Sequence, residues 1–386
     1  MRNAACCLAL AFGLSLAAAD PPTPAERLNA LRESVGAAEK QYYKAVEALG
    51  DTEADNKKGD QLWKAFDATQ EAGLVTALDL AKADPKSEAG FDALEWIAST
   101  PRAYYKPVGS PALELLAEHY AADPRVGRAV GVLGPLTTHD LIPAHPAATR
   151  LMKAVARHNP DRTARGQAYF GLALQAKSRF AVAEYRNLPT EDALAVEAEK
   201  QFTLLVRDYG DCRDTRRSDA RLKTVTLGDR AEAELFELQN LRVGKSAPEI
   251  AGEDLAGVPF KLSDSRGKVT MLLFWASWCG PCMAAVPREK KIVERFKGRP
   301  FTLVGVNGDD DPVAAKKAIT MAEIPWRSFR DAKSAGVRTI SGQYNVHGWP
   351  TVYVLDRKGV IRAKNFYGDE LDELLEELVE ESEAAK

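Results

Sequence analysis

Two different patterns of hydrophobic and polar positions divide this chain. From residue 24 to about 240, Ala, Leu, Glu, Lys and Arg dominate and the alternation of a half-buried strand is absent, which predicts helices throughout. From Phe260 onward, short apolar runs alternate with helix-like segments, as in an α/β domain. The change falls at residues 243–248, where glycine and proline interrupt the helical pattern.

The helical region contains a weak internal repeat. Segments 78–85, 115–124 and 151–160 each read as an apolar helix that ends at Asp-Pro or Asn-Pro. Their final prolines are 39 residues (85 to 124) and 36 residues (124 to 160) apart, a period typical of tetratricopeptide or HEAT hairpin arrays. Proline cannot continue a helix but suits the first position of the next one. We therefore predict a solenoid-like array of helical hairpins, with an irregular bundle as the alternative.

In the second region, apolar runs bounded by turn residues predict the strands, and amphipathic stretches predict the helices. The predicted strands are 269–276, 301–306, 351–355 and 360–364, the last two forming a hairpin. The predicted helices follow Cys282, span 312–321 and close the chain, where Leu371, Leu375 and Leu378 share one face.

The first 19 residues have the pattern of a secretory signal peptide. Arg2 gives a positive start, residues 8–16 an apolar core, and Ala17–Ala19 a small-residue cleavage site. An uncleaved membrane anchor is the alternative, although the apolar run is too short to span a bilayer comfortably. Cleavage would place the mature chain in the periplasm or otherwise outside the cytoplasm.

Length and charge limit the architecture and the partners. A chain of 386 residues exceeds one ordinary core, so we expect a signal peptide at 1–19, an α-helical repeat-like domain at 20–240 and a second domain at 243–386. Lys plus Arg number 52 against 55 for Asp plus Glu, which leaves no basic surface for nucleic acid.

Candidate chemistry lies at residues 278–282, Trp-Cys-Gly-Pro-Cys, between a predicted strand and a predicted helix. Cys279 would face the free N–H groups of a helix N-terminus, which stabilise a thiolate. Cys282 lies one helical turn further on, close enough to form a disulfide with Cys279, so the pair can exchange two electrons with another thiol pair. Cleavage would leave Cys212 as the third cysteine of a chain with too few for a disulfide scaffold.

Other uses of this cysteine pair fit the sequence poorly. A zinc site needs two more ligands at ordinary spacing, and the chain has no second cysteine pair. Haem attachment needs a histidine after the second cysteine, where Met283 stands. We predict no metal and no cofactor, and we interpret His347 as a surface residue near the site. Cys212 is interpreted as structural, although Arg213, Arg216 and Arg217 could lower its pKa.

The second region resembles the TlpA-like thiol–disulfide oxidoreductases, a thioredoxin-fold family, over about residues 243–382. The strand and turn at 274–282 match the family's active site, Pro287 matches its helix-kinking proline, and residues 348–351 match its cis-proline loop. Residues 243–248 and 262–264 resemble its N-terminal extension. The whole chain more loosely resembles multi-domain exported proteins of planctomycete-type bacteria.

The resemblance implies roles for the site residues. Cys279 would be the nucleophile and Cys282 the resolving thiol, with Trp278, Gly280 and Pro281 completing the active-site loop. Residues 349–351 (Trp349, Pro350 and Thr351) would receive an extended protein substrate beside the disulfide. We expect Trp349 and Trp278 to form an aromatic rim around the substrate, and the alternative is that Trp349 packs as core.

Two positions depart from the family pattern. Leu273 and Ala285 stand where the family carries acids that move the proton of the resolving thiol. Glu289, seven residues past Cys282, shares its helix face but lies beyond the Pro287 kink. We therefore expect slow exchange at neutral pH, or a high pKa for Cys282.

The expected function is that of an exported oxidoreductase, favoured as a reductase of protein disulfides. By analogy with the family, its electron donor would be a membrane-embedded thiol carrier. One alternative is a helical scaffold that binds a protein partner and carries an accessory thioredoxin-like domain. Another is a peroxiredoxin-like antioxidant protein, although that class uses a lone cysteine after Thr or Ser.

Overall fold

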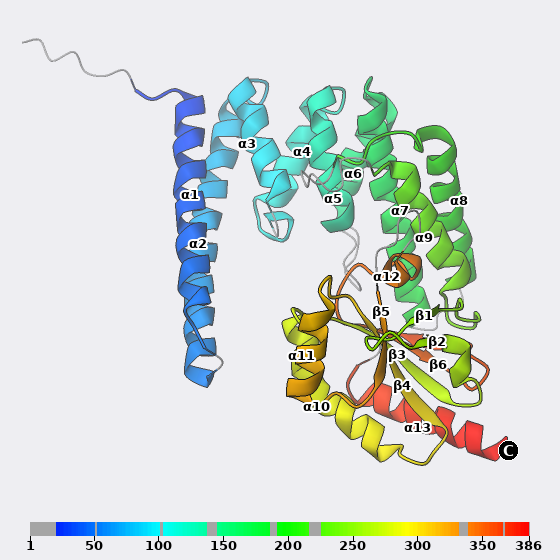
Figure 1. Cartoon of the computed structure of the whole chain (residues 1–386). Coiled ribbons are helices and arrows are strands. Elements are labelled where there is room, and N and C mark those ends of the chain that lie inside the picture. The colour runs from blue at the N-terminus through cyan, green and yellow to red at the C-terminus, as the bar shows by residue number, and fades with distance from the viewer. Residues whose placement is uncertain are drawn as a thin grey trace, which may run out of the picture. The chain divides into compact units, whose positions relative to one another are not determined.

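The computed structural model describes residues 21–50, 52–100, 103–136, 145–185, 191–215, 225–331, 339–365 and 367–385. The chain forms two compact units, Met1–Ala121 and Ala122–Lys386. Helices make up most of the described chain before residue 241, and an α/β domain follows, which confirms the predicted fold class (Figure 1). The predicted signal peptide lies outside the described residues. In the described ranges, no helix has both the length and the apolar content needed to cross a membrane.

The first unit is a series of antiparallel helices in which each helix packs against the next. Its first two helices begin with complete capping boxes, Thr23 with Glu26 and Thr52 with Asp55, so their first free N–H groups are satisfied by side chains. The helices are α1 (Pro24–Glu47), α2 (Glu53–Ala83), α3 (Glu88–Ser99) and α4 (Gly109–His119).

Five further helices open the second unit. Small and aromatic side chains of α7, α8 and α9 share one core that includes Phe170, Phe202 and Leu238. The second of these helices, α8, contributes Ala195, Ala198, Phe202 and Leu205 to this core. The helices are α5 (Gly127–Leu136), α6 (Pro146–His158), α7 (Arg162–Tyr185), α8 (Glu191–Tyr209) and α9 (Leu227–Asn240).

The three repeat copies end differently. The first and third follow the prediction: Asp84 ends α2 and Asn159 ends α6. The second copy stops earlier, because α4 ends at His119 and the buried Tyr120 packs against Phe91. Its Asp123 instead accepts a hydrogen bond from the backbone of Arg125, at the start of a short 3-10 helix.

The α/β domain is built on a five-stranded sheet in the order β5-β4-β3-β6-β7, with a separate two-stranded ribbon, β1-β2. β3 lies at the centre, parallel to β4 and antiparallel to β6, and all seven of its side chains are buried. The strands are β1 (Ala251–Glu253), β2 (Pro259–Lys261), β3 (Val269–Trp275), β4 (Phe301–Asn307), β5 (Arg327–Arg330), β6 (Thr351–Leu355) and β7 (Ile361–Lys364).

Helices cover both faces of this sheet. On one face α10, α11 and α13 pack on the side chains of Met271, Leu273 and Trp275. On the other, Leu272 and Phe274 meet α12 and the segment that leads in from α9. The helices are α10 (Gly280–Arg295), α11 (Pro312–Ala322), α12 (Ile340–Gln343) and α13 (Asp369–Ala384). Cys279 and Cys282, which follow the carboxyl end of β3, belong to the core on the α10, α11 and α13 face.

Candidate active site

The cysteine pair lies where β3 passes into α10. Cys279 is the N-cap of α10, and its Sγ accepts a hydrogen bond from the backbone N–H of Cys282 at 3.1 Å. The two cysteines form a disulfide across a Cα–Cα distance of 5.2 Å. Cys279 exposes 5% of its surface and Cys282 exposes 2%, so both are buried in this oxidised form. A reductant must reach the pair through the small exposed edge of Cys279.

A buried carboxylate holds the active-site loop in place. Asp309 accepts hydrogen bonds from the backbone N–H of Ser277 at 2.9 Å and from its Oγ at 2.5 Å. The side-chain amide of Asn307 donates to the same carboxylate at 2.7 Å. These contacts tie the residues just before Cys279 to the end of β4.

The sequence interpretation did not include Asp309. Its signal was present, because Asn307-Gly308-Asp309 follows the predicted strand 301–306. The carboxyl ends of parallel neighbouring strands meet at one edge of a sheet, where sites form. Polar residues at that edge, next to the strand that leads to Cys279, are therefore candidates for site residues.

The Trp349–Pro350 peptide bond is cis, as the resemblance implies. Thr351 begins β6, and its Oγ1 donates to the carbonyl oxygen of Gly348 at 2.8 Å, which closes the loop on itself. The carbonyl oxygen of Pro350 accepts a hydrogen bond from the Tyr367 hydroxyl at 3.0 Å. The hydroxyl of Thr351 is thus occupied within the protein, and its backbone pairs in register with Phe274 of β3.

Trp278 and Trp349 lie edge to face, with ring centroids 5.8 Å apart. Trp278 is 62% exposed, whereas Trp349 is half-buried. The Trp349 ring also approaches Phe274, at 6.4 Å between centroids, and lies directly against the Cα of Gly308. Trp349 therefore combines both predicted positions, with one side packed as core and another meeting the exposed Trp278.

The acid positions of the family pattern are apolar here, as the sequence shows. Leu273 is buried in β3, and Ala285 lies on α10. Glu289 lies on the buried face of α10 with Cys282 and Val286. Burial raises the pKa of Glu289 to about 7, against a smaller opposing effect of Arg288. Its Oε2 has no hydrogen-bond partner among the described residues.

His347 is exposed, as predicted, and its Nε2 lies 3.2 Å from Glu234 of α9. Glu234, Glu237 and His347 bring ligand atoms within 4.8 Å of one another, the geometry of a metal site. Lys177 and Lys364 already pair with these carboxylates. The arrangement is that of an ion-pair cluster, because a dication would have to displace both ammonium groups.

Cys212 is buried between α8 and α9. Burial raises the pKa of its thiol, while the guanidinium of Arg162, 3.4 Å from Sγ, acts in the opposite direction. Arg216 and Arg217, which the sequence interpretation placed nearby, lie outside the described residues. The buried position supports a structural role.

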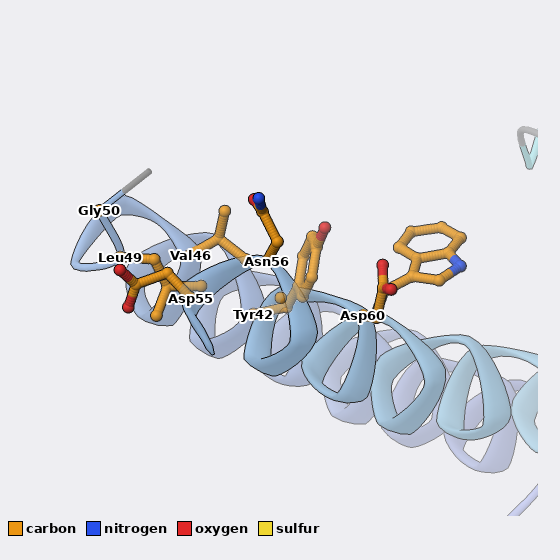
Figure 2. A pocket seen from close by; sticks show the side chains of 9 residues that line it. Tyr42, Val46, Leu49, Gly50, Asp55, Asn56 and Asp60 are labelled. Atoms are coloured by element: carbon orange, nitrogen blue, oxygen red, sulfur yellow. The ribbon is translucent and has the colours of Figure 1, made fainter. Parts of the chain in front are cut away.

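An open pocket lies at the end of the α1–α2 hairpin (Figure 2). Figure 2 shows Leu49 and Asp55 close to the turn and Asp60 further along α2. The carboxylate of Asp55 is occupied by the capping box with Thr52. Aromatic rings and carboxylates line the pocket, and its lining residues include no cysteine.

Comparisons with known proteins identify the α/β domain. The Redoxin family model matches residues 242–382. The thioredoxin-like protein YneN of Bacillus subtilis is 32% identical over 125 residues, which are 32% of this chain and 70% of that protein. The thiol-disulfide oxidoreductase ResA of Bacillus cereus is 28% identical over 138 residues, 36% of this chain and 77% of that protein. Through this domain, the chain belongs to the thioredoxin-like thiol–disulfide oxidoreductases.

One solved structure is similar to the same region. The thioredoxin domain of a thiol-disulfide oxidoreductase from Bacteroides vulgatus is 32% identical and covers 36% of this chain and 99% of its own, with a TM-score of 0.34. The family match confirms the resemblance noted in the sequence over about residues 243–382.

Proposed function

We propose that the protein is an exported reductase of protein disulfides that works through Cys279-Gly280-Pro281-Cys282. The observation that carries the proposal is the Cys279–Cys282 disulfide at the N-terminus of α10. A helix N-terminus stabilises a thiolate, so Cys279 is the residue suited to attack once the pair is reduced. Export rests on the signal-peptide pattern of the first 19 residues.

The reaction proceeds in two exchanges. The Cys279 thiolate attacks one sulfur of a substrate disulfide, which forms a mixed disulfide and releases the first substrate thiolate. Cys282 loses its proton and attacks Sγ of Cys279, which re-forms the Cys279–Cys282 bond and releases the second substrate thiolate. The two released thiolates take up two protons, and two electrons pass from the cysteine pair to the substrate. A dithiol donor, by family analogy a membrane-embedded thiol carrier, then reduces the pair again.

The surface around the disulfide suits an extended polypeptide. The backbone of residues 349–351 would pair with a substrate strand, as in strand addition to a sheet edge. Trp278 is largely exposed beside this backbone and offers an apolar contact. Trp349, packed against Gly308, forms the inner side of this rim.

Replacing the two cysteines by serine, one at a time, tests the proposal. Cys279→Ser should abolish reduction of insulin disulfides by the full chain with dithiothreitol as donor. Cys282→Ser should stop after the first exchange and accumulate a mixed disulfide that mass spectrometry detects. Activity that survives Cys279→Ser would contradict the proposal. An oxidising potential of the pair would instead support disulfide formation, because potential decides the direction of exchange.

The second candidate is a scaffold function for the helical region. Successive hairpins can present a surface to a protein partner, with the redox domain acting on what is recruited. The Cys279→Ser variant separates the two in cells, because a scaffold keeps its role without the thiol whereas an enzyme does not.

A further inference from the structure

Helix α9 carries two acids where its other buried side chains are apolar. Its inward face includes Ala231, Glu234 and Leu238, and Glu234 is only 2% exposed. Glu237, one turn further on, is also largely buried. Lys177 of α7 lies 2.5 Å from each carboxylate. Charges that leave water need such partners, since an unpaired buried charge is strongly unfavourable.

The remaining partners come from the redox domain. Lys364 of β7 pairs with Glu237. The side-chain amide of Asn345 donates to Glu234 at 3.1 Å and to Glu237 at 2.5 Å. His347 reaches Glu234 at 3.2 Å. Two acids and two lysines balance in charge, while Asn345 and His347 add contacts from the segment that leads to the cis-proline.

This segment, residues 345–350, is held at both ends. At its start, Asn345 has a backbone φ of +48°, in the left-handed region that asparagine tolerates better than most residues, and its side chain points to α9. At its end, Trp349 packs against Gly308 and against Trp278, the residue before Cys279. The segment is therefore fixed by helix α9 on one side and by the active site on the other.

We propose that Glu234 and Glu237 of α9 are positioning residues for the substrate-docking loop at residues 345–350. This inference rests on the proposed function, since it assigns the last helical hairpin a part in docking protein disulfides. A loop that is already ordered loses less entropy when the substrate binds. Loosening the loop should therefore raise KM for a protein substrate and leave the chemistry of the sulfurs unchanged.

The experiment uses Glu234→Gln in the full chain, which removes the charge and keeps the shape. We expect kcat/KM for insulin disulfides to fall about tenfold, mainly through KM. Reduction of bis(2-hydroxyethyl) disulfide, which needs no docking surface, should keep its rate, and the potential of the Cys279–Cys282 pair should not change. An equal fall in kcat/KM for both substrates, or no fall for either, would overturn the proposal.

Two further variants make the test decisive. Glu71→Gln removes a partly exposed carboxylate that lies 2.8 Å from Lys106 in the first unit, and it should leave both rates unchanged. His347→Gln acts at the exposed end of the cluster, so the fold tolerates it, and it should raise KM for insulin about threefold. If Glu234→Gln does not fold, an unchanged KM in His347→Gln contradicts the proposal. Loss of activity in Cys279→Ser concerns the proposed function alone.

Discussion

Glu289 places a carboxyl group in an apolar environment on the helix that carries Cys282. It exposes 6% of its surface, and burial raises its pKa from 4.5 to about 7, with Arg288 acting the other way. Between pH 4.5 and about pH 7, Glu289 keeps its proton in the folded protein but has released it in the unfolded chain. Rising pH therefore lowers the free energy of unfolding across this window, because the folded state binds more protons.

Replacing Glu289 by glutamine, its neutral isostere, removes the loss of stability that ionisation of the buried carboxyl causes as pH rises. We expect Glu289→Gln to raise the free energy of unfolding by about 2 to 3 kcal/mol at pH 8 and by little at pH 4. Urea unfolding at both pH values measures the difference. Glu294→Gln, at an exposed position of the same helix, should change stability by less than about 0.5 kcal/mol at either pH. An equal gain of Glu289→Gln at both pH values would point to packing rather than ionisation.

At the scale of elements, the turn after β4 and the loop before β6 approach each other so closely that a glycine is required. A Cβ added at Gly308 would lie 2.4 Å from Cη2 of Trp349. We expect Gly308→Ala to displace the Trp349 ring and raise KM for insulin disulfides about threefold or more. Tryptophan fluorescence and steady-state kinetics measure the two effects. Gly252→Ala, on β1 away from the docking loop, where an added Cβ meets only Phe329 at 3.6 Å, is the control, and an equal effect there would contradict the steric explanation.

The elements that the sequence predicts are those with a strong local pattern. The central strand, 269–276, is a continuous apolar run and corresponds to β3 within one residue. Strand β5 was missed because its four residues, Arg-Ser-Phe-Arg, carry charges at both ends and lie at the sheet edge. Helix α12 has only four residues, too few to show a helical period.

The same reasoning explains which parts of the site the sequence reveals. Cys279 and Cys282 are three residues apart, so a motif shows them together. Asp309 and Ser277 are 32 residues apart, and Asn345 and Glu234 are 111 residues apart. A charged residue on an apolar helix face, such as Glu234, indicates that a charged or hydrogen-bonding partner lies buried beside it. The sequence does not show which residue that partner is.

At the scale of the molecule, the end of helix α9 belongs to a hydrophobic core of the redox domain. Leu241, which ends α9, is buried in the cluster that contains Tyr353 of β6 and Ile361 of β7. The backbone N–H of Val243 donates to Glu184 of α7 at 3.1 Å. Residues 122–386 form one compact unit, and the predicted domain boundary at residues 240–243 stays a prediction about independent folding.

Leu241→Ala tests whether the sheet and the last helices unfold together. Truncating a buried leucine should lower the free energy of unfolding by about 2 to 5 kcal/mol. If the unit is cooperative, hydrogen exchange of the most protected amides in α8 and in β3 should accelerate by the same factor, because both report the same opening. Val243→Ala is the control, because Val243 is 45% exposed and the variant keeps the backbone hydrogen bond to Glu184. It should change the free energy of unfolding and the exchange rates by little. Faster exchange in α8 with unchanged exchange in β3 would mean that the helices open without the redox domain, and the coupling of α9 to the docking loop would then be weaker than its ion pairs imply.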